Sequence, residues 1–172
     1  MELIDGVIIM EDIMADIEEM MEGLKTVEDA INLALTIENQ GQKFYSEKAN
    51  SVVSIQAKDL FTYLAAEEAR HIVYLNDFKN TGKASVIKNV DPANFTPSFE
   101  IEFTGAKPGE MDVLMGALGF EQKNENFYKK LAAQSEDPDQ KEFFTIMTSF
   151  EHEHLELIDG FIDAATQFRM QT

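Results

Sequence analysis

The chain contains an internal repeat, in which residues 38–78 align without a gap on residues 121–161, an offset of 83 positions. Most aligned positions differ, but a chemically distinctive set is identical. Each copy has a Glu, a Phe-Tyr pair that begins six residues later, and a Glu-x-x-His that begins thirty residues later. The shared residues are Glu38, Phe44, Tyr45, Glu68 and His71 in the first copy and Glu121, Phe127, Tyr128, Glu151 and His154 in the second. The fold must therefore use the same set of polar side chains twice.

Apolar residues recur at helical spacing through both copies, and this periodicity predicts four helices. The expected helices span residues 26–53, 54–80, 108–134 and 137–166. Thr26 and Asp29 resemble a capping box at the start of the first helix, and Pro108 suits an early helical position. The stretch between the second and third helices contains Pro92 and Pro97. At roughly 3.3 Å per residue it is long enough to run from one end of a bundle to the other.

These elements predict an all-α domain, which 172 residues suffice to form with a substantial core. The expected domain is a four-helix bundle over residues 26–168, made of the hairpins 26–80 and 108–166 and a crossover over 81–107. Residues 1–25 are a separate amphipathic segment, rich in Met and acidic residues. We expect this segment to form a short helix that docks on the bundle or on a partner subunit.

Composition excludes several classes of function. The chain has no cysteine, which rules out disulfides, Cys-based zinc sites and iron–sulfur clusters within it. A formal charge of −18 repels phosphate backbones, so nucleic acid is not an expected partner. No apolar stretch approaches the roughly 20 residues of a membrane helix, and the N-terminus has no basic region of a secretory signal. The expected location is the cytoplasm.

The spacing of the repeated residues places them at one level of the bundle. Glu38 and Glu68 each lie about 15 residues from the predicted turn near residue 53, which is ~22 Å along a helix. Glu121 and Glu151 have the same relation to a turn near residue 136. A crossover would set the two hairpins side by side about a pseudo-twofold axis, so that all four carboxylates meet. In each Glu-x-x-His, residues i and i+3 share one helix face.

Four carboxylates in a bundle core require compensation. Without cations they would cost many kcal/mol or would remain protonated. Two divalent ions would cancel the four negative charges. The mixed oxygen and nitrogen donor set suits Fe or Mn, and Zn can also occupy it. A Glu from each of two helices and a Glu-x-x-His from each of the other two is the arrangement of di-iron carboxylate bundles.

These residues resemble the rubrerythrin-like branch of the ferritin-like di-iron carboxylate superfamily, over about residues 27–165. The resemblance rests on Ile37-Glu38, Phe44-Tyr45, Leu60-Phe61, residues 64–68, His71, Glu121, Phe127-Tyr128, Phe144, Glu151 and His154. It implies a ferritin-like bundle that binds two Fe ions, with Mn or Zn as other occupants. It also implies that the bridging ligands are Glu68 and Glu151. The remaining ligands would be Glu38 and His71 for one ion and Glu121 and His154 for the other.

Some positions depart from the family pattern or have two interpretations. Rubrerythrins usually carry a further Glu where this chain has Asn124, and the neighbouring Glu125 could either reach the site or face outward. Tyr45 and Tyr128 lie two helical turns from a Glu, where they could hydrogen-bond ligands or only pack in the core. The residues next to the ligands, namely Glu67, His152 and Glu153, are expected on a solvated face.

The resemblance implies a non-haem di-iron oxidoreductase, of peroxidase or ferroxidase type, in which Fe(II) reacts with hydrogen peroxide or O2. Glu68 and Glu151 are the expected catalytic residues, because they would hold the two ions together. An external electron-donor protein would replace the missing rubredoxin module, and a homodimer is the expected assembly. The alternative is ferritin-like iron oxidation, storage or delivery without peroxidase turnover. A third interpretation is an acidic helical interaction module in which the metal is structural.

Overall fold

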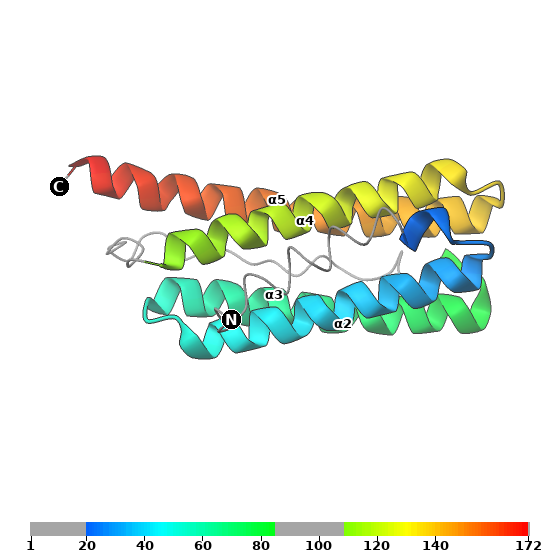
Figure 1. Ribbon diagram of the computed structural model, residues 1–172, viewed down its shortest axis with the longest axis horizontal. Coiled ribbons are helices and arrows are strands. Elements are labelled where there is room, and N and C mark those ends of the chain that lie inside the picture. Colours follow the sequence, from blue (N-terminus) through cyan, green and yellow to red (C-terminus); the bar gives the residue numbers. More distant parts are fainter. Residues whose placement is uncertain (1–19, 85–108, 172) are drawn as a thin grey trace, which may run out of the picture.

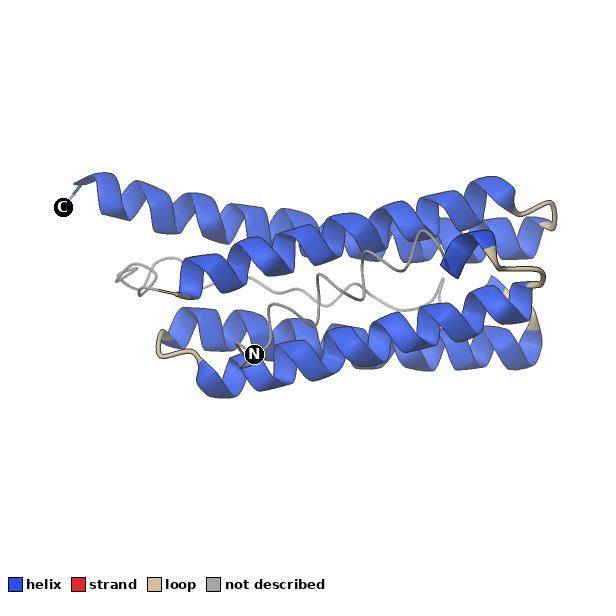
Figure 2. Cartoon of the chain, viewed as in Figure 1, coloured by secondary structure: helices blue, strands red, loops and turns tan. Residues whose placement is uncertain are grey.

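The computed structural model describes residues 20–84 and 109–171, with side chains described as far as residue 167. The described residues are almost all helical, and none of them lies in a strand (Figure 2). The long helices are α2 (Val27–Ser51), α3 (Ile55–Thr81), α4 (Glu110–Gln134) and α5 (Pro138–Gln171). The prediction of an all-α, ferritin-like helical bundle is confirmed.

Helix boundaries agree with the sequence prediction except at two ends. Helix α4 begins at Glu110 rather than at 108, because Gly109 takes the N-cap position with a φ of +90°, outside the range of a right-handed helix. Helix α5 continues to Gln171 rather than ending near 166. No Gly or Pro follows Thr166, so the sequence has no helix breaker there.

Local capping fixes where the first hairpin begins and ends. The capping box predicted at Thr26 and Asp29 is present, with the Thr26 hydroxyl accepting from Asp29 N at 3.0 Å and the Asp29 carboxylate accepting from Thr26 N at 3.0 Å. Ser54 caps α3 by accepting from Ala57 N at 3.1 Å. Gly82 ends α3 in the left-handed conformation, with a φ of +64° that favours glycine.

The two hairpins, α2–α3 and α4–α5, lie side by side (Figure 1). Glu110, at the start of α4, reaches the α2–α3 turn and is only 6% exposed. Its Oε1 accepts hydrogen bonds from Val53 N at 2.8 Å and Ser54 N at 2.9 Å. The start of α4 therefore lies at the opposite end of the bundle from Thr81, the last residue of α3. The two helix ends are positioned as a crossover connection requires.

Apolar and aromatic side chains fill the bundle on both sides of a central polar layer. Phe78 of α3 stacks on Phe143 of α5, with ring centroids 4.1 Å apart. Towards the other end, Tyr45 of α2 stacks on Phe61 of α3 at 6.0 Å. The core thus joins the two hairpins while leaving the middle of the bundle to charged residues.

Large parts of two predicted segments fall outside the described residues. The amphipathic segment predicted over residues 1–25 is described only from residue 20, and the crossover predicted over 81–107 is described only as far as residue 84. Pro108, expected at an early helical position, also lies outside the described residues. Of the N-terminal segment, residues 20–22 are helical, and Met21 and Leu24 pack partly buried against the core. Among the described helices, none is both long and apolar enough to cross a membrane.

Replacing Glu110 by Ala should lower the free energy of unfolding by about 1–3 kcal/mol, because it leaves two backbone N–H groups of the α2–α3 turn without their acceptor. Chemical denaturation followed by circular dichroism measures this. Glu47→Ala is the matched control, since the side chain of Glu47 is 61% exposed and its ion pair with Lys43 is long, at 3.9 Å. An equal, small effect of both substitutions would contradict the role given to Glu110.

Candidate metal centre

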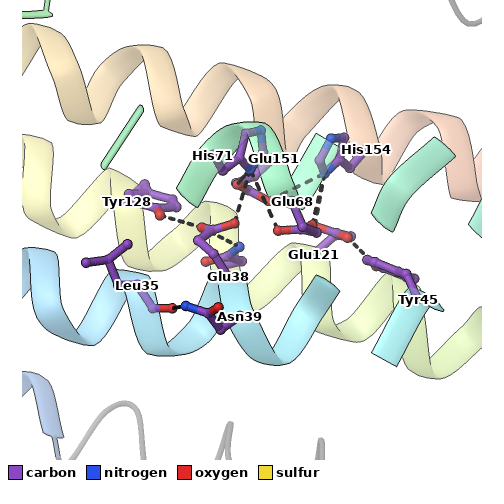
Figure 3. Close-up of polar contacts among 11 residues, drawn as sticks. Leu35, Glu38, Asn39, Tyr45, Glu68, His71, Glu121, Tyr128, Glu151 and His154 are labelled. Atoms are coloured by element: carbon purple, nitrogen blue, oxygen red, sulfur yellow. Dashed lines mark hydrogen bonds and ion pairs between the residues drawn. The ribbon is translucent and has the colours of Figure 1, made fainter. Parts of the chain in front are cut away.

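The middle of the bundle contains a buried cluster of four carboxylates and two imidazoles. Each helix supplies a carboxylate, and α3 and α5 each add a histidine. None of the four Glu residues has any exposed surface, and the histidines are 1% and 3% exposed. The cluster comprises Glu38, Glu68, His71, Glu121, Glu151 and His154. The structure thus brings together all six predicted ligands, which are the Glu and His residues of the repeat, and Figure 3 shows their side chains converging from different helices.

Helix geometry explains why the six side chains meet. In α3, Glu68 and His71 are one turn apart on the same face, and Glu151 and His154 repeat this arrangement in α5. These four residues offer ligand atoms that all lie within 4.8 Å of one another. The two imidazole rings stack with centroids 5.1 Å apart and an angle of 13° between their planes.

Around His71, three carboxylates approach one ring nitrogen. His71 Nδ1 lies 3.1 Å from Glu38 Oε2, 3.7 Å from Glu68 Oε2 and 3.0 Å from Glu151 Oε1. These contacts define one half of the cluster. It contains His71, the Glu38 carboxylate of α2 and one carboxylate oxygen each from Glu68 and Glu151.

The half around His154 is built in the same way. His154 Nδ1 lies 3.5 Å from Glu68 Oε1, 3.6 Å from Glu121 Oε2 and 3.7 Å from Glu151 Oε2. Glu68 and Glu151 therefore each direct one oxygen towards His71 and the other towards His154. This is the disposition required of two carboxylates that bridge a pair of cations.

The donor atoms fit a pair of metal ions. Two ligand atoms bonded to one ion at about 2.1 Å, roughly a right angle or a tetrahedral angle apart, are about 3.0–3.4 Å from each other. The distances within each half of the cluster are close to this range. Within the described residues, no hydrogen bond of ordinary geometry satisfies either carboxylate oxygen of Glu68 or Glu151, Glu121 Oε2 or His154 Nδ1. Buried polar atoms without a hydrogen-bond partner destabilise the folded state, and bound cations would supply the missing partners.

The two tyrosines of the repeat hydrogen-bond carboxylates of the opposite hairpin. Tyr45 of α2 donates to Glu121 Oε1 on α4, and Tyr128 of α4 donates to Glu38 Oε1 on α2 (Figure 3). Of the two interpretations of these tyrosines, hydrogen bonding to the cluster is confirmed. Each bond is accepted by Oε1, the outer oxygen of the carboxylate, which is the one further from the histidines. The other oxygen, Oε2, faces His71 in Glu38 and His154 in Glu121.

Both hydroxyls remain hydrogen-bond donors. Burial raises the pKa of Tyr45 well above its usual value, and the nearby Glu121 carboxylate raises it further. Burial and the Glu38 carboxylate do the same for the pKa of Tyr128. The protons therefore stay on the phenol oxygens, where they orient the two carboxylates.

In the protein without metal, the carboxyl groups of the cluster differ in charge state. Burial raises the pKa of Glu68 and of Glu151 well above the ordinary range, and the neighbouring carboxylates raise both further. Burial also acts to raise the pKa of Glu38, but the adjacent Glu68 carboxyl, the charge and ring nitrogen of His71 and the Tyr128 hydroxyl outweigh it and hold this pKa at about 2. The central carboxyls thus retain protons that bound cations would displace.

Asn124 is a site residue whose role the sequence left undefined. It is fully buried, and its Nδ2 lies 3.4 Å from Glu38 Oε1. The signal available in the sequence was its position three residues after Glu121, on the same helix face.

Glu125 lies beside the cluster and binds other partners. Its side chain is 10% exposed, and its Oε1 is 2.7 Å from Lys129 Nζ and 3.0 Å from His152 Nδ1. His152 and Glu153 lie on the exposed side of α5, as expected. The expectation for Glu67 is wrong, because its side chain is only 12% exposed and pairs with Arg70.

The charge state of the cluster predicts an unusual pH dependence for the protein without metal. The raised pKa values of Glu68 and Glu151 mean that the folded chain binds these protons more tightly than the unfolded chain does. Their stabilising effect is complete below about pH 4.3 and is lost as the pH rises through the raised values. Glu38 acts oppositely, and its contribution is lost only as the pH falls towards about 2.

We therefore expect the Tm of the metal-free protein to fall as the pH rises above about 4.3, the ordinary pKa of Glu, and this fall to be smaller with Zn²⁺ bound. Calorimetry on chelator-treated and Zn²⁺-loaded samples measures both. The double variant Glu68→Gln/Glu151→Gln is the control, because its amides do not titrate. Its Tm should therefore change less steeply with pH than that of the unmodified protein. If the Tm of the metal-free double variant changes with pH as steeply as that of the unmodified metal-free protein, groups other than Glu68 and Glu151 cause the fall.

Comparison with known proteins agrees with this geometry. The Rubrerythrin family model matches residues 29–162, well over half of the chain. No curated protein and no solved structure gives a significant match. The matched range includes the six clustered residues, and the buried carboxylate and histidine cluster fits a two-metal site of the di-iron kind. The chain belongs to the rubrerythrin family.

Proposed function

We propose that this protein is a di-iron oxidoreductase that reduces hydrogen peroxide or O2 with electrons from a separate donor protein. The observation that supports this most strongly is the disposition of Glu68 and Glu151. Each carboxylate has one oxygen near His71 and the other near His154, at 3.0–3.7 Å. Two carboxylates placed in this way would hold two ions side by side, which is the arrangement that lets a metal pair act on one small oxidant.

The remaining residues complete the two ligand sets. Glu38 and His71 serve one ion, and Glu121 and His154 serve the other. The tyrosine hydroxyls fix the outer oxygen of each terminal carboxylate before metal arrives, so the ligands require little rearrangement on binding. Burial of all six side chains excludes bulk water, which strengthens the attraction between carboxylates and cations.

When bound, a pair of Fe²⁺ ions supplies the two electrons that, with two protons, reduce hydrogen peroxide to two water molecules. A separate donor protein would have to supply two electrons for each peroxide reduced. The four carboxylates fit this chemistry, because their negative charges would balance two divalent ions and would also stabilise the higher positive charge of an oxidised pair. Histidine nitrogen and carboxylate oxygen together suit iron in both oxidation states. A dimer of this chain is part of the proposal.

Rapid mixing of anaerobically Fe²⁺-loaded protein with peroxide, and separately with O2, tests the proposed function. We expect about two Fe per chain and an Fe³⁺ absorbance that rises within the mixing experiment. Glu68→Ala should slow the rise by more than about 100-fold, because changes in the neighbours of metal ligands alone typically cost 10–100-fold. The faster of the two oxidants identifies the substrate.

Glu153→Gln is the matched control, since Glu153 lies between Glu151 and His154 in the sequence but is exposed. It should react like the unmodified protein. A rise as slow in the unmodified protein as in Glu68→Ala would rule out oxidant reduction at this site. Light scattering and iron analysis of the same sample test the alternative. Storage predicts a large shell with many irons per chain, whereas the proposal predicts a dimer with about two irons per chain.

A further inference from the structure

The pseudo-twofold symmetry of the cluster is broken beside its two terminal carboxylates, Glu38 and Glu121. The 83-residue offset relates Glu38 to Glu121 and Tyr45 to Tyr128, and it relates Gly41 to Asn124. Gly41 and Asn124 each lie three residues after the terminal carboxylate of their own helix. One side of the cluster therefore has a buried carboxamide where the other side has no side chain at all.

The carboxamide gives Glu38 a second hydrogen-bond donor. Glu38 Oε1 accepts from the Tyr128 hydroxyl and from Asn124 Nδ2 at 3.4 Å. Glu121 Oε1 accepts from Tyr45 alone among the described residues. Both outer oxygens are thus held by a tyrosine from the opposite hairpin, but only that of Glu38 is held from a second direction.

Packing keeps a second carboxamide out of the equivalent place. A Cβ atom at Gly41 would lie 3.1 Å from two atoms of the Phe120 ring and 3.3 Å from Glu68 Cδ. The space that Asn124 occupies on one side of the cluster is filled by Phe120 on the other. The difference between the halves is therefore built into the core.

Asn124 also has a feature that is costly for a purely structural residue. It is fully buried, and its Oδ1 has no hydrogen-bond partner among the described residues. An unsatisfied buried acceptor destabilises a fold, and an apolar side chain of similar shape would avoid that cost. Asn124 therefore supplies a hydrogen-bond donor to Glu38 although its own Oδ1 is left without a partner among the described residues.

From this asymmetry we infer that Asn124 is a positioning residue that makes the two metal positions unequal, so that the position of Glu38 and His71 binds a divalent cation more tightly than that of Glu121 and His154. A carboxylate whose outer oxygen is held by two donors is already oriented when the ion arrives. Less ordering is then required on binding. This inference rests on the proposed two-metal centre and adds an order of filling to it.

Zn²⁺ binding to single-position variants tests the inference without any redox reaction. His154→Ala leaves the position of Glu38 and His71 complete, and His71→Ala leaves that of Glu121 and His154 complete. We expect His154→Ala to bind its remaining ion roughly tenfold or more tightly than His71→Ala, measured by competition with a coloured chelator. Adding Asn124→Leu should weaken binding about 10–100-fold in the His154→Ala background and change it little in the His71→Ala background.

Two further variants exclude trivial explanations. Asn124→Ala removes the same donor without adding apolar bulk, so it replaces Asn124→Leu if that protein fails to fold. Asn39→Leu is the matched control, because Asn39 is an exposed carboxamide next to Glu38 in the sequence that donates instead to Leu35 O at 2.6 Å. It should leave both affinities unchanged.

Equal affinities in the two histidine variants, or equal weakening of both by Asn124→Leu, would overturn the inference while leaving the two-metal centre intact. If the unmodified protein and both histidine variants bind no Zn²⁺, the metal centre itself is wrong and the inference fails with it.

Discussion

The electrostatic cost of burying four carboxylates at one level of a helical bundle is the constraint on which the rest of the structure depends. Glu38, Glu68, Glu121 and Glu151 have no exposed surface, and no basic residue other than histidine is among their close partners in the described part of the chain. Such a layer is stable only if protons or cations neutralise it. Without metal, burial and the neighbouring carboxylates raise the pKa values of Glu68 and Glu151, so protons neutralise these two central carboxyls while Glu38 stays ionised. Two divalent cations would do so while also satisfying the buried oxygens.

The fold serves this layer by holding two similar hairpins in register. Each tyrosine of the repeat crosses from its own hairpin to a carboxylate of the other, so neither half of the cluster is complete alone. Glu110 fixes the relative position of the hairpins at one end by accepting from the α2–α3 turn. Aromatic stacking of Phe78 on Phe143 joins them towards the other end. The metal ligands are thus positioned by contacts between hairpins as much as by helix periodicity.

Much of this arrangement could be predicted from the sequence, because spacing within a helical hairpin is simple arithmetic. The thirty-residue interval placed each Glu pair level across its turn, and the i, i+3 relation placed each histidine beside a carboxylate. Much of what spacing could not show depends on the approach of one hairpin to the other. This explains why the tyrosine bonds, which cross between the hairpins, were one of two interpretations. The pairing of Glu125 on α4 with His152 on α5 lies within one hairpin, but it depends on side-chain directions that residue spacing does not give. The contact of Glu110 with the turn also joins residues far apart in sequence, which no local pattern reveals.

Anomalous diffraction at the iron edge, from crystals grown with Fe²⁺ under anaerobic conditions, tests the central claim most directly. The account predicts two anomalous peaks in the bundle core, both bonded to Glu68 and Glu151, with one next to His71 and Glu38 and the other next to His154 and Glu121. No peak between the helices, a single peak, or peaks confined to the acidic surface would contradict it.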